Sequence, residues 1–88
     1  MIVAICDSEL LGKRFEEGEF QIDVKDSFYG GERKTEEEVI EIMQEMLAED
    51  ATFNIVGKKS TQAALKAGII DKKAIGKIKG IPFTLVLM

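Results

Sequence analysis

The chain has 88 residues, of which 45% are hydrophobic and 32% charged, and its net charge is −4. This size predicts a single small domain spanning residues 1–88, because a second domain would have no core of its own. Apolar runs fall well short of the ~20 residues that a membrane span requires, and no basic leader precedes the first of them. We therefore expect a cytoplasmic protein that has no membrane partner.

The residue types that support common catalytic chemistry are scarce. The chain has no histidine, which excludes Ser–His, Cys–His and His-based metal sites. Its one cysteine, Cys6, cannot form an intrachain disulfide. Asp7 beside it would raise the thiol pKa, so a structural cysteine is favoured over a nucleophile. We expect no metal, no cofactor and no catalytic residue, and the sequence favours a binding protein over an enzyme.

The first part of the chain alternates apolar stretches with turns. Val3–Cys6 is a β-branched run typical of a strand buried on both faces. Residues 7–12 predict one helical turn closed by glycine, and residues 13–16 a short extended piece. Residues 20–24 alternate apolar and polar side chains, which predicts a strand with one wet face. A turn at Glu17-Gly18 precedes that strand.

A glycine pair and a capping signal mark the middle of the chain. Gly30 and Gly31 permit positive φ, so we expect a sharp turn there. Thr35 and Glu38 have the spacing of a capping box at the start of a helix. That helix carries apolar residues at the spacing of one buried stripe: Val39, Ile42, Met43, Met46 and Leu47.

The last part of the chain predicts a strand, a helix and two further strands. Residues 52–56 read as a strand, and Ser60 is the expected N-cap of a helix that Gly68 closes. Residues 75–79 and 83–87 are the final two strands. The order is roughly β-β-α-β-α-β-β, which indicates the α/β class, with α+β as the alternative. We expect a mixed sheet of four to five strands covered by two main helices.

Charge is segregated along the sequence. Residues 1–56 hold five basic and fifteen acidic side chains, whereas residues 57–88 hold seven basic side chains and one acid. A solvated surface with local ion pairs is the usual outcome of such a run. A face that contacts RNA or another anion is the functional alternative, and a docking face for an acidic protein is a third. The basic residues are all lysines: Lys58, Lys59, Lys66, Lys72, Lys73, Lys77 and Lys79.

Two local patterns are candidate binding sites. The helix start at Gly57–Ser60 lacks the GxxxxGK[ST] pattern of a nucleotide-binding loop. Its free N–H groups, with Lys58 and Lys59 beside them, could still hold an anion. The structural alternative is that Gly57 only forms a turn and Ser60 only caps the helix. The second candidate is the rim of a small pocket formed by Tyr29, Gly30 and Gly31; a packed aromatic turn is the favoured structural alternative.

Several segments together resemble a known family. In chain order they are Val3-Ala4-Ile5-Cys6-Asp7, Leu10-Leu11-Gly12-Lys13, Phe28-Tyr29-Gly30-Gly31, Asn54-Ile55-Val56-Gly57, Ala67-Gly68-Ile69-Ile70-Asp71 and Gly80-Ile81-Pro82. The chain is similar, over nearly its whole length, to the archaeal family catalogued as domain of unknown function 424. The resemblance implies a small archaeal cytoplasmic protein to which no activity or catalytic residue is assigned.

The main hypothesis is a non-catalytic binding module. It would associate with RNA or a ribonucleoprotein through the lysine-rich C-terminal half, where the candidate contacts are Lys58, Lys59, Ser60, Lys77 and Lys79. One alternative is a small-ligand or anion-binding protein, or a minor enzyme, that uses the helix start at Gly57–Ser60. The other is a self-associating subunit of an oligomer.

Overall fold

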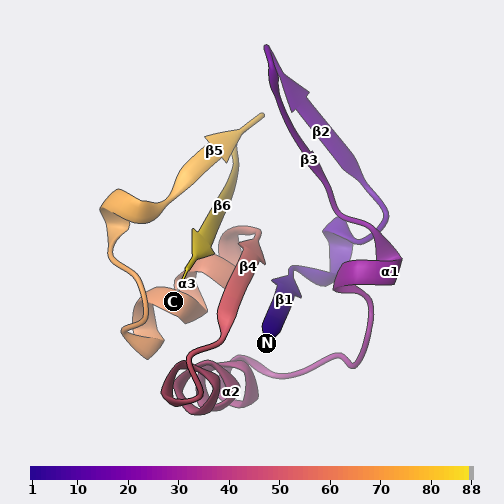
Figure 1. The fold of residues 1–88 in the computed structure, drawn as a ribbon. Helices are drawn as coiled ribbons and strands as arrows, with labels where there is room; N and C mark the ends of the chain where they lie inside the picture. Colours follow the sequence, from indigo (N-terminus) through magenta and orange to yellow (C-terminus); the bar gives the residue numbers. More distant parts are fainter. Residues whose placement is uncertain (88) are drawn as a thin grey trace.

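The computed structural model describes residues 1–87. Its main sheet has four strands in the order β1 (Ile2–Cys6), β4 (Thr52–Val56), β6 (Ile81–Val86) and β5 (Gly76–Ile78) (Figure 1). β1 runs parallel to β4, whereas the β4–β6 and β6–β5 pairs are antiparallel. The predicted mixed sheet is confirmed, and β1 and β5 lie at its two edges.

The position of β1 corrects the sequence analysis, which predicted a strand buried on both faces. The side chains from Val3 to Cys6 are only partly buried. The reason is that β1 pairs with β4 alone, and no other strand of residues 1–87 lies against its outer edge. An apolar run specifies a strand, but it does not specify how many neighbours that strand has.

Two main helices cover one face of the sheet. α2 (Glu36–Ala48) begins with the predicted capping box: the Glu38 N–H donates to the Thr35 hydroxyl at 3.2 Å, and the Thr35 N–H donates to the Glu38 carboxylate at 2.9 Å. α3 (Lys58–Ala67) ends at Gly68, which is left-handed as expected. No helix in the described part of the chain could cross a membrane. The core under these helices consists of Met43, Ala51, Phe53, Ile55, Ala63 and Ala64.

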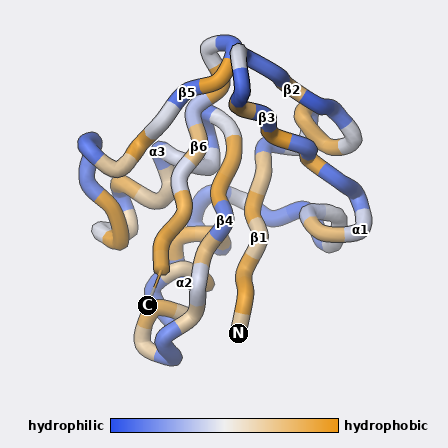
Figure 2. Tube along the Cα trace, turned by 45° about the horizontal axis from the view of Figure 1, so that its top comes forward, coloured by the Kyte–Doolittle hydropathy of each residue, from blue (hydrophilic) through white to orange (hydrophobic). Residues whose placement is uncertain are grey.

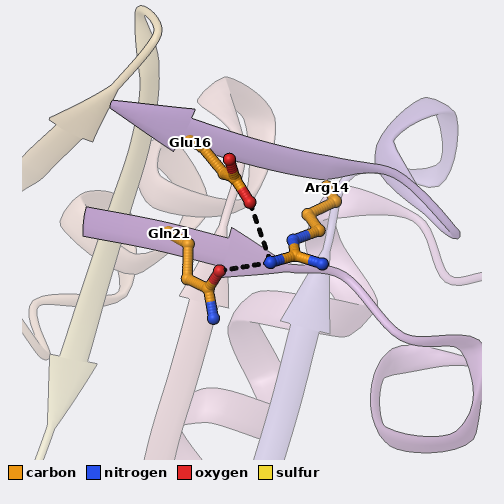
Figure 3. A network of polar contacts seen from close by, with 3 residues as sticks. All are labelled: Arg14, Glu16 and Gln21. Carbon is orange, nitrogen blue, oxygen red and sulfur yellow. Dashed lines mark hydrogen bonds and ion pairs between the residues drawn. The ribbon is translucent and has the colours of Figure 1, made fainter. Parts of the chain in front are cut away.

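A hairpin covers part of the opposite face. β2 (Arg14–Glu17) and β3 (Phe20–Asp23) form a separate two-stranded antiparallel sheet. On the outer side of the hairpin the Arg14 guanidinium contacts the Glu16 carboxylate at 2.8 Å and the Gln21 side-chain oxygen at 2.6 Å (Figure 3). Beneath it lies a second, smaller core formed by Leu10, Val24 and Val56.

Three short helical turns complete the fold: η1 (Ser8–Leu10), α1 (Asp26–Tyr29) and η2 (Lys72–Ala74). The chain bends at Gly31 as predicted, but without positive φ, since Gly30 has φ −69° and Gly31 also lies outside that region. Glycine is needed at position 30 because there is no space for a side chain. A Cβ there would collide with the Asp26 carbonyl oxygen one turn earlier in α1.

Candidate functional site

Asp7, which directly follows β1, caps the start of α3. Its buried carboxylate accepts hydrogen bonds from the N–H of Lys59 at 3.1 Å and from the N–H and hydroxyl of Ser60, both at 2.8 Å. The parallel pairing of β1 with β4 explains this contact, because it brings the carboxyl ends of both strands to the same place. Asp7 is therefore hydrogen-bonded to a residue 53 positions later in the sequence.

This arrangement corrects the prediction that Ser60 is the N-cap. The N-cap is Gly57, and Ser60 lies buried in the first turn of α3. Gly57 has φ +113°, and a Cβ on it would collide with the Asp7 carboxylate, so glycine is required on both counts. The N–H groups of Lys59 and Ser60, which the anion prediction took as free, are hydrogen-bonded to Asp7. An external anion would therefore have to compete with the Asp7 carboxylate for these N–H groups.

One hollow, which we call the edge cleft, has a volume of about 810 Å³ and runs along β1. Tyr29 and Gly31 line it, and so do Lys59 and Ser60, so the two candidate sites of the sequence analysis meet in one place. Gly30 is not among its lining residues. Val3, Ile5, Val39, Ile42 and Ala63 supply apolar lining.

The titratable groups in the edge cleft are poorly suited to nucleophilic chemistry. Burial raises the pKa of the Cys6 thiol, and the negative charges of Asp7 and Glu9 raise it further. Burial likewise raises the pKa of Tyr29, with a smaller contribution from Cys6. Both groups stay protonated at neutral pH, and the thiolate is the reactive form of cysteine. Among residues 1–87, no three Cys, Asp or Glu side chains are grouped so as to hold a metal.

A second hollow, which we call the basic hollow, has a volume of about 450 Å³ and lies between α3, η2 and the β5–β6 hairpin. Lys58, Lys72 and Lys77 line it, and none of the three belongs to an ion pair formed within the described residues. The one acid of this segment, Asp71, is engaged locally: its carboxylate accepts the Lys73 N–H at 2.9 Å. The remaining lining consists of Thr61, Gln62, Leu65, Ile75, Gly80 and Pro82.

The structure thus divides the five residues that the sequence singled out for anion binding. Lys58 and Lys77 share the basic hollow, whereas Lys59 and Ser60 belong to the edge cleft. Lys79 lines neither hollow; it occupies the β5–β6 turn, where its N–H donates to a Glu17 carboxylate oxygen at 3.2 Å.

Sequence reasoning missed three residues of these sites. Lys72 completes the lysine cluster, Arg33 lines the edge cleft, and Asp7 organises the start of α3. Counting charges along the sequence includes Lys72 and Arg33, but it does not show that they lie beside these two hollows. Asp7 had a weak signal, since α3 begins without an acid in its own first turn. Only the parallel β1–β4 pair shows that the cap comes from elsewhere.

Comparisons with known proteins agree with the resemblance noted in the sequence. Residues 1–88 match the family described as "Protein of unknown function (DUF424)". No curated protein matches the chain significantly. The fold is similar to a solved structure titled "Crystal structure of an uncharacterized conserved protein from Methanopyrus kandleri", with 22% identity and a TM-score of 0.84. The match covers 98% of this chain and 81% of that one, and at this identity it shows the fold alone.

Proposed function

Because the chain belongs to the DUF424 family, whose function is unknown, we propose a function from its own surfaces: a non-catalytic module that binds RNA through the basic hollow. The observation that carries the proposal is the convergence of Lys58, Lys72 and Lys77 on one hollow without ion-pair partners among residues 1–87. Three ammonium groups around a concave surface suit the phosphates of a polyanion.

The lining also indicates how such binding would discriminate. It includes no arginine and no aromatic side chain, so neither bidentate recognition of guanine nor base stacking has support. Phosphate contacts position a nucleic acid without reading its sequence. The proposal is therefore an RNA contact of low sequence specificity. The thiol of Cys6, kept protonated in the other hollow, offers no evident nucleophile, which favours binding over catalysis.

Salt dependence tests the proposal directly. Fluorescence anisotropy with a short single-stranded RNA measures Kd at increasing KCl concentrations. Three phosphate contacts predict a slope of about −2 for the logarithm of affinity against that of salt, from about −0.7 per contact. Lys77→Gln and Lys58→Gln should each make the slope less steep by about 0.7 and weaken binding to unrelated RNA sequences equally.

Lys66→Gln is the matched control, because Lys66 lies on the same helix but pairs with Glu36 at 2.8 Å. Its slope should equal that of the unmodified chain. A slope that stays the same when Lys58, Lys72 and Lys77 are all changed to Gln would refute the proposal. Loss of affinity in Lys66→Gln equal to that in Lys77→Gln would show that net charge, and not the basic hollow, binds RNA.

A further inference from the structure

The basic hollow is built from separate parts of the chain that hydrogen bonds hold together. The N–H of Gly57, the residue before Lys58, donates to the Pro82 carbonyl of β6 at 2.8 Å. On the other side, the Thr84 hydroxyl of β6 donates to the Ala74 carbonyl of η2 at 2.9 Å. The start of α3 and η2 are therefore both attached to the same strand.

The strand register explains why Lys77 joins them. Lys77 of β5 lies directly opposite Pro82 of β6, and opposite residues of antiparallel strands share one face of the sheet. Thr84, two positions further along β6, is on the same face and lies opposite Ile55 of the core under α3. Figure 2 shows hydrophilic residues in the connection from α3 to β5 and again in β5. Lys77 thus lies on the face that α3 covers, at the basic hollow.

The charges around the basic hollow are all of one sign. Among residues 1–87 its lining includes three lysines and no acid: Lys58, Lys72 and Lys77. The lining also includes apolar side chains, those of Leu65, Ile75 and Pro82. Clefts that combine charges of one sign with walls of low dielectric constant concentrate the electrostatic field. Such a site favours the ligand that brings the most negative charge into the smallest space.

The size of the hollow limits how much of an RNA it holds. Its volume of about 450 Å³ is near the lower end of the range of about 300–1,000 Å³ for small-molecule pockets, so it suits one nucleotide and not a run of several. An internal nucleotide lies between two phosphodiesters, each with one negative charge. At the end of a strand, a phosphate monoester carries about −1.5 to −2 at pH 7. A phosphorylated terminal nucleotide therefore brings nearly three negative charges to three lysines.

We propose that the basic hollow binds the phosphorylated end of an RNA strand. The ammonium groups of Lys58, Lys72 and Lys77 hold the terminal phosphate monoester and the next phosphodiester. Hydrogen bonds between charged groups of this kind are about twice as strong as those between neutral groups. The inference rests on the proposed function, because it specifies which part of an RNA the same site contacts. The chemistry is shared by 5′-phosphorylated and 3′-phosphorylated ends, and the experiment separates the two.

The test compares RNAs of one sequence that differ only at their ends: 5′-phosphate, 3′-phosphate, or hydroxyl at both ends. Fluorescence anisotropy of an internal label measures Kd for the complete chain at a fixed KCl concentration. One phosphorylated form should bind about tenfold more tightly than the hydroxyl form, which is the effect of one further hydrogen bond to a charged group. A hydroxyl-ended RNA two nucleotides longer is the control for total charge, and it should not show this gain.

Variants of the chain test whether the preference comes from the basic hollow. Lys72→Gln should reduce the preference to less than about threefold, because it removes one of the charged donors. Lys66→Gln, at the lysine that pairs with Glu36, should keep it at about tenfold. Equal melting temperatures of the two variants would show that both are folded. Lowering the pH from about 7.5 to about 5.5 should also reduce the preference, since a phosphate monoester has a second pKa of about 6.

The outcomes separate this inference from the proposed function. Equal affinity for phosphorylated and hydroxyl ends, with binding that still weakens in Lys58→Gln and Lys77→Gln, would overturn the inference alone. Binding that does not depend on these lysines would overturn both. A preference that Lys72→Gln leaves at full size would overturn the inference too, because another surface would then hold the phosphate. An equal gain from the longer hydroxyl-ended RNA would do the same, since total charge would then decide affinity.

Discussion

The two edges of the main sheet differ in length, charge and surroundings. β1 has five residues without a charge or a proline among them, whereas β5 has only three and carries Lys77 at its centre. Lys79 follows β5 immediately, and the β2–β3 hairpin stands beside that edge. β1 instead borders the edge cleft.

This difference bears on how each edge avoids unwanted pairing. Short strands and lysines are common devices that keep an edge from pairing with another chain. β5 has both devices and β1 has neither. A long apolar edge without such protection is a ready site for strand addition, and at β1 the recess restricts what can reach it. The comparison predicts that β1 is the edge more open to pairing with another chain, and that β5 is the better protected one.

The largest expected effect concerns the contact that fixes the carboxyl end of β1. Asp7→Ala removes the acceptor of three hydrogen bonds and leaves buried donors at the start of α3 without a partner. We expect the free energy of unfolding, measured in urea, to fall by about 2–3 kcal/mol. Glu9→Ala, at an exposed acid nearby, should change it by less than about 0.5 kcal/mol. Equal stability of the two variants would mean that the Asp7 cap contributes nothing.

A smaller effect is expected on the reactivity of Cys6 at the same end. Its pKa is raised, so at a given mildly alkaline pH the folded chain holds less thiolate than the unfolded chain. Alkylation by iodoacetamide should therefore be several-fold slower in the folded chain than in urea, and the rate should rise with pH over a higher range. Glu9→Gln removes one of the charges that raise this pKa and should speed the reaction. A rate equal to that in urea would contradict the account of the edge cleft.

The smallest change in stability is expected at the other edge. Lys77→Val removes an exposed charge from β5, and the free energy of unfolding should change by less than about 0.5 kcal/mol. Self-association should increase, because the edge loses its protecting lysine. Light scattering at increasing protein concentration measures this. Lys72→Val removes a lysine from the same hollow but not from a strand, and it should stay monodisperse. If both variants associate equally, edge protection is not the cause.

Much of the fold could be predicted because its signals are local. The Thr35–Glu38 capping box, the Gly68 helix end and the alternation in β3 each involve residues a few positions apart. Short-range hydrogen bonding and backbone conformation decide such features regardless of the rest of the chain. The two main helices and the mixed sheet followed from them. α1 was missed because its four residues are too few to show a helical period.

The candidate sites were predicted less well because they depend on contacts between distant residues. The sequence by itself determined the charge segregation, the absence of histidine and the apolar character of β1. Only the tertiary structure decided that Lys59 faces the edge cleft while Lys58 faces the basic hollow, one position apart on α3. The reason is geometric: neighbouring positions on a helix point about 100° apart, and which hollow each faces depends on how α3 packs on the sheet. The same holds for Asp7, whose role exists only because β1 and β4 pair in parallel.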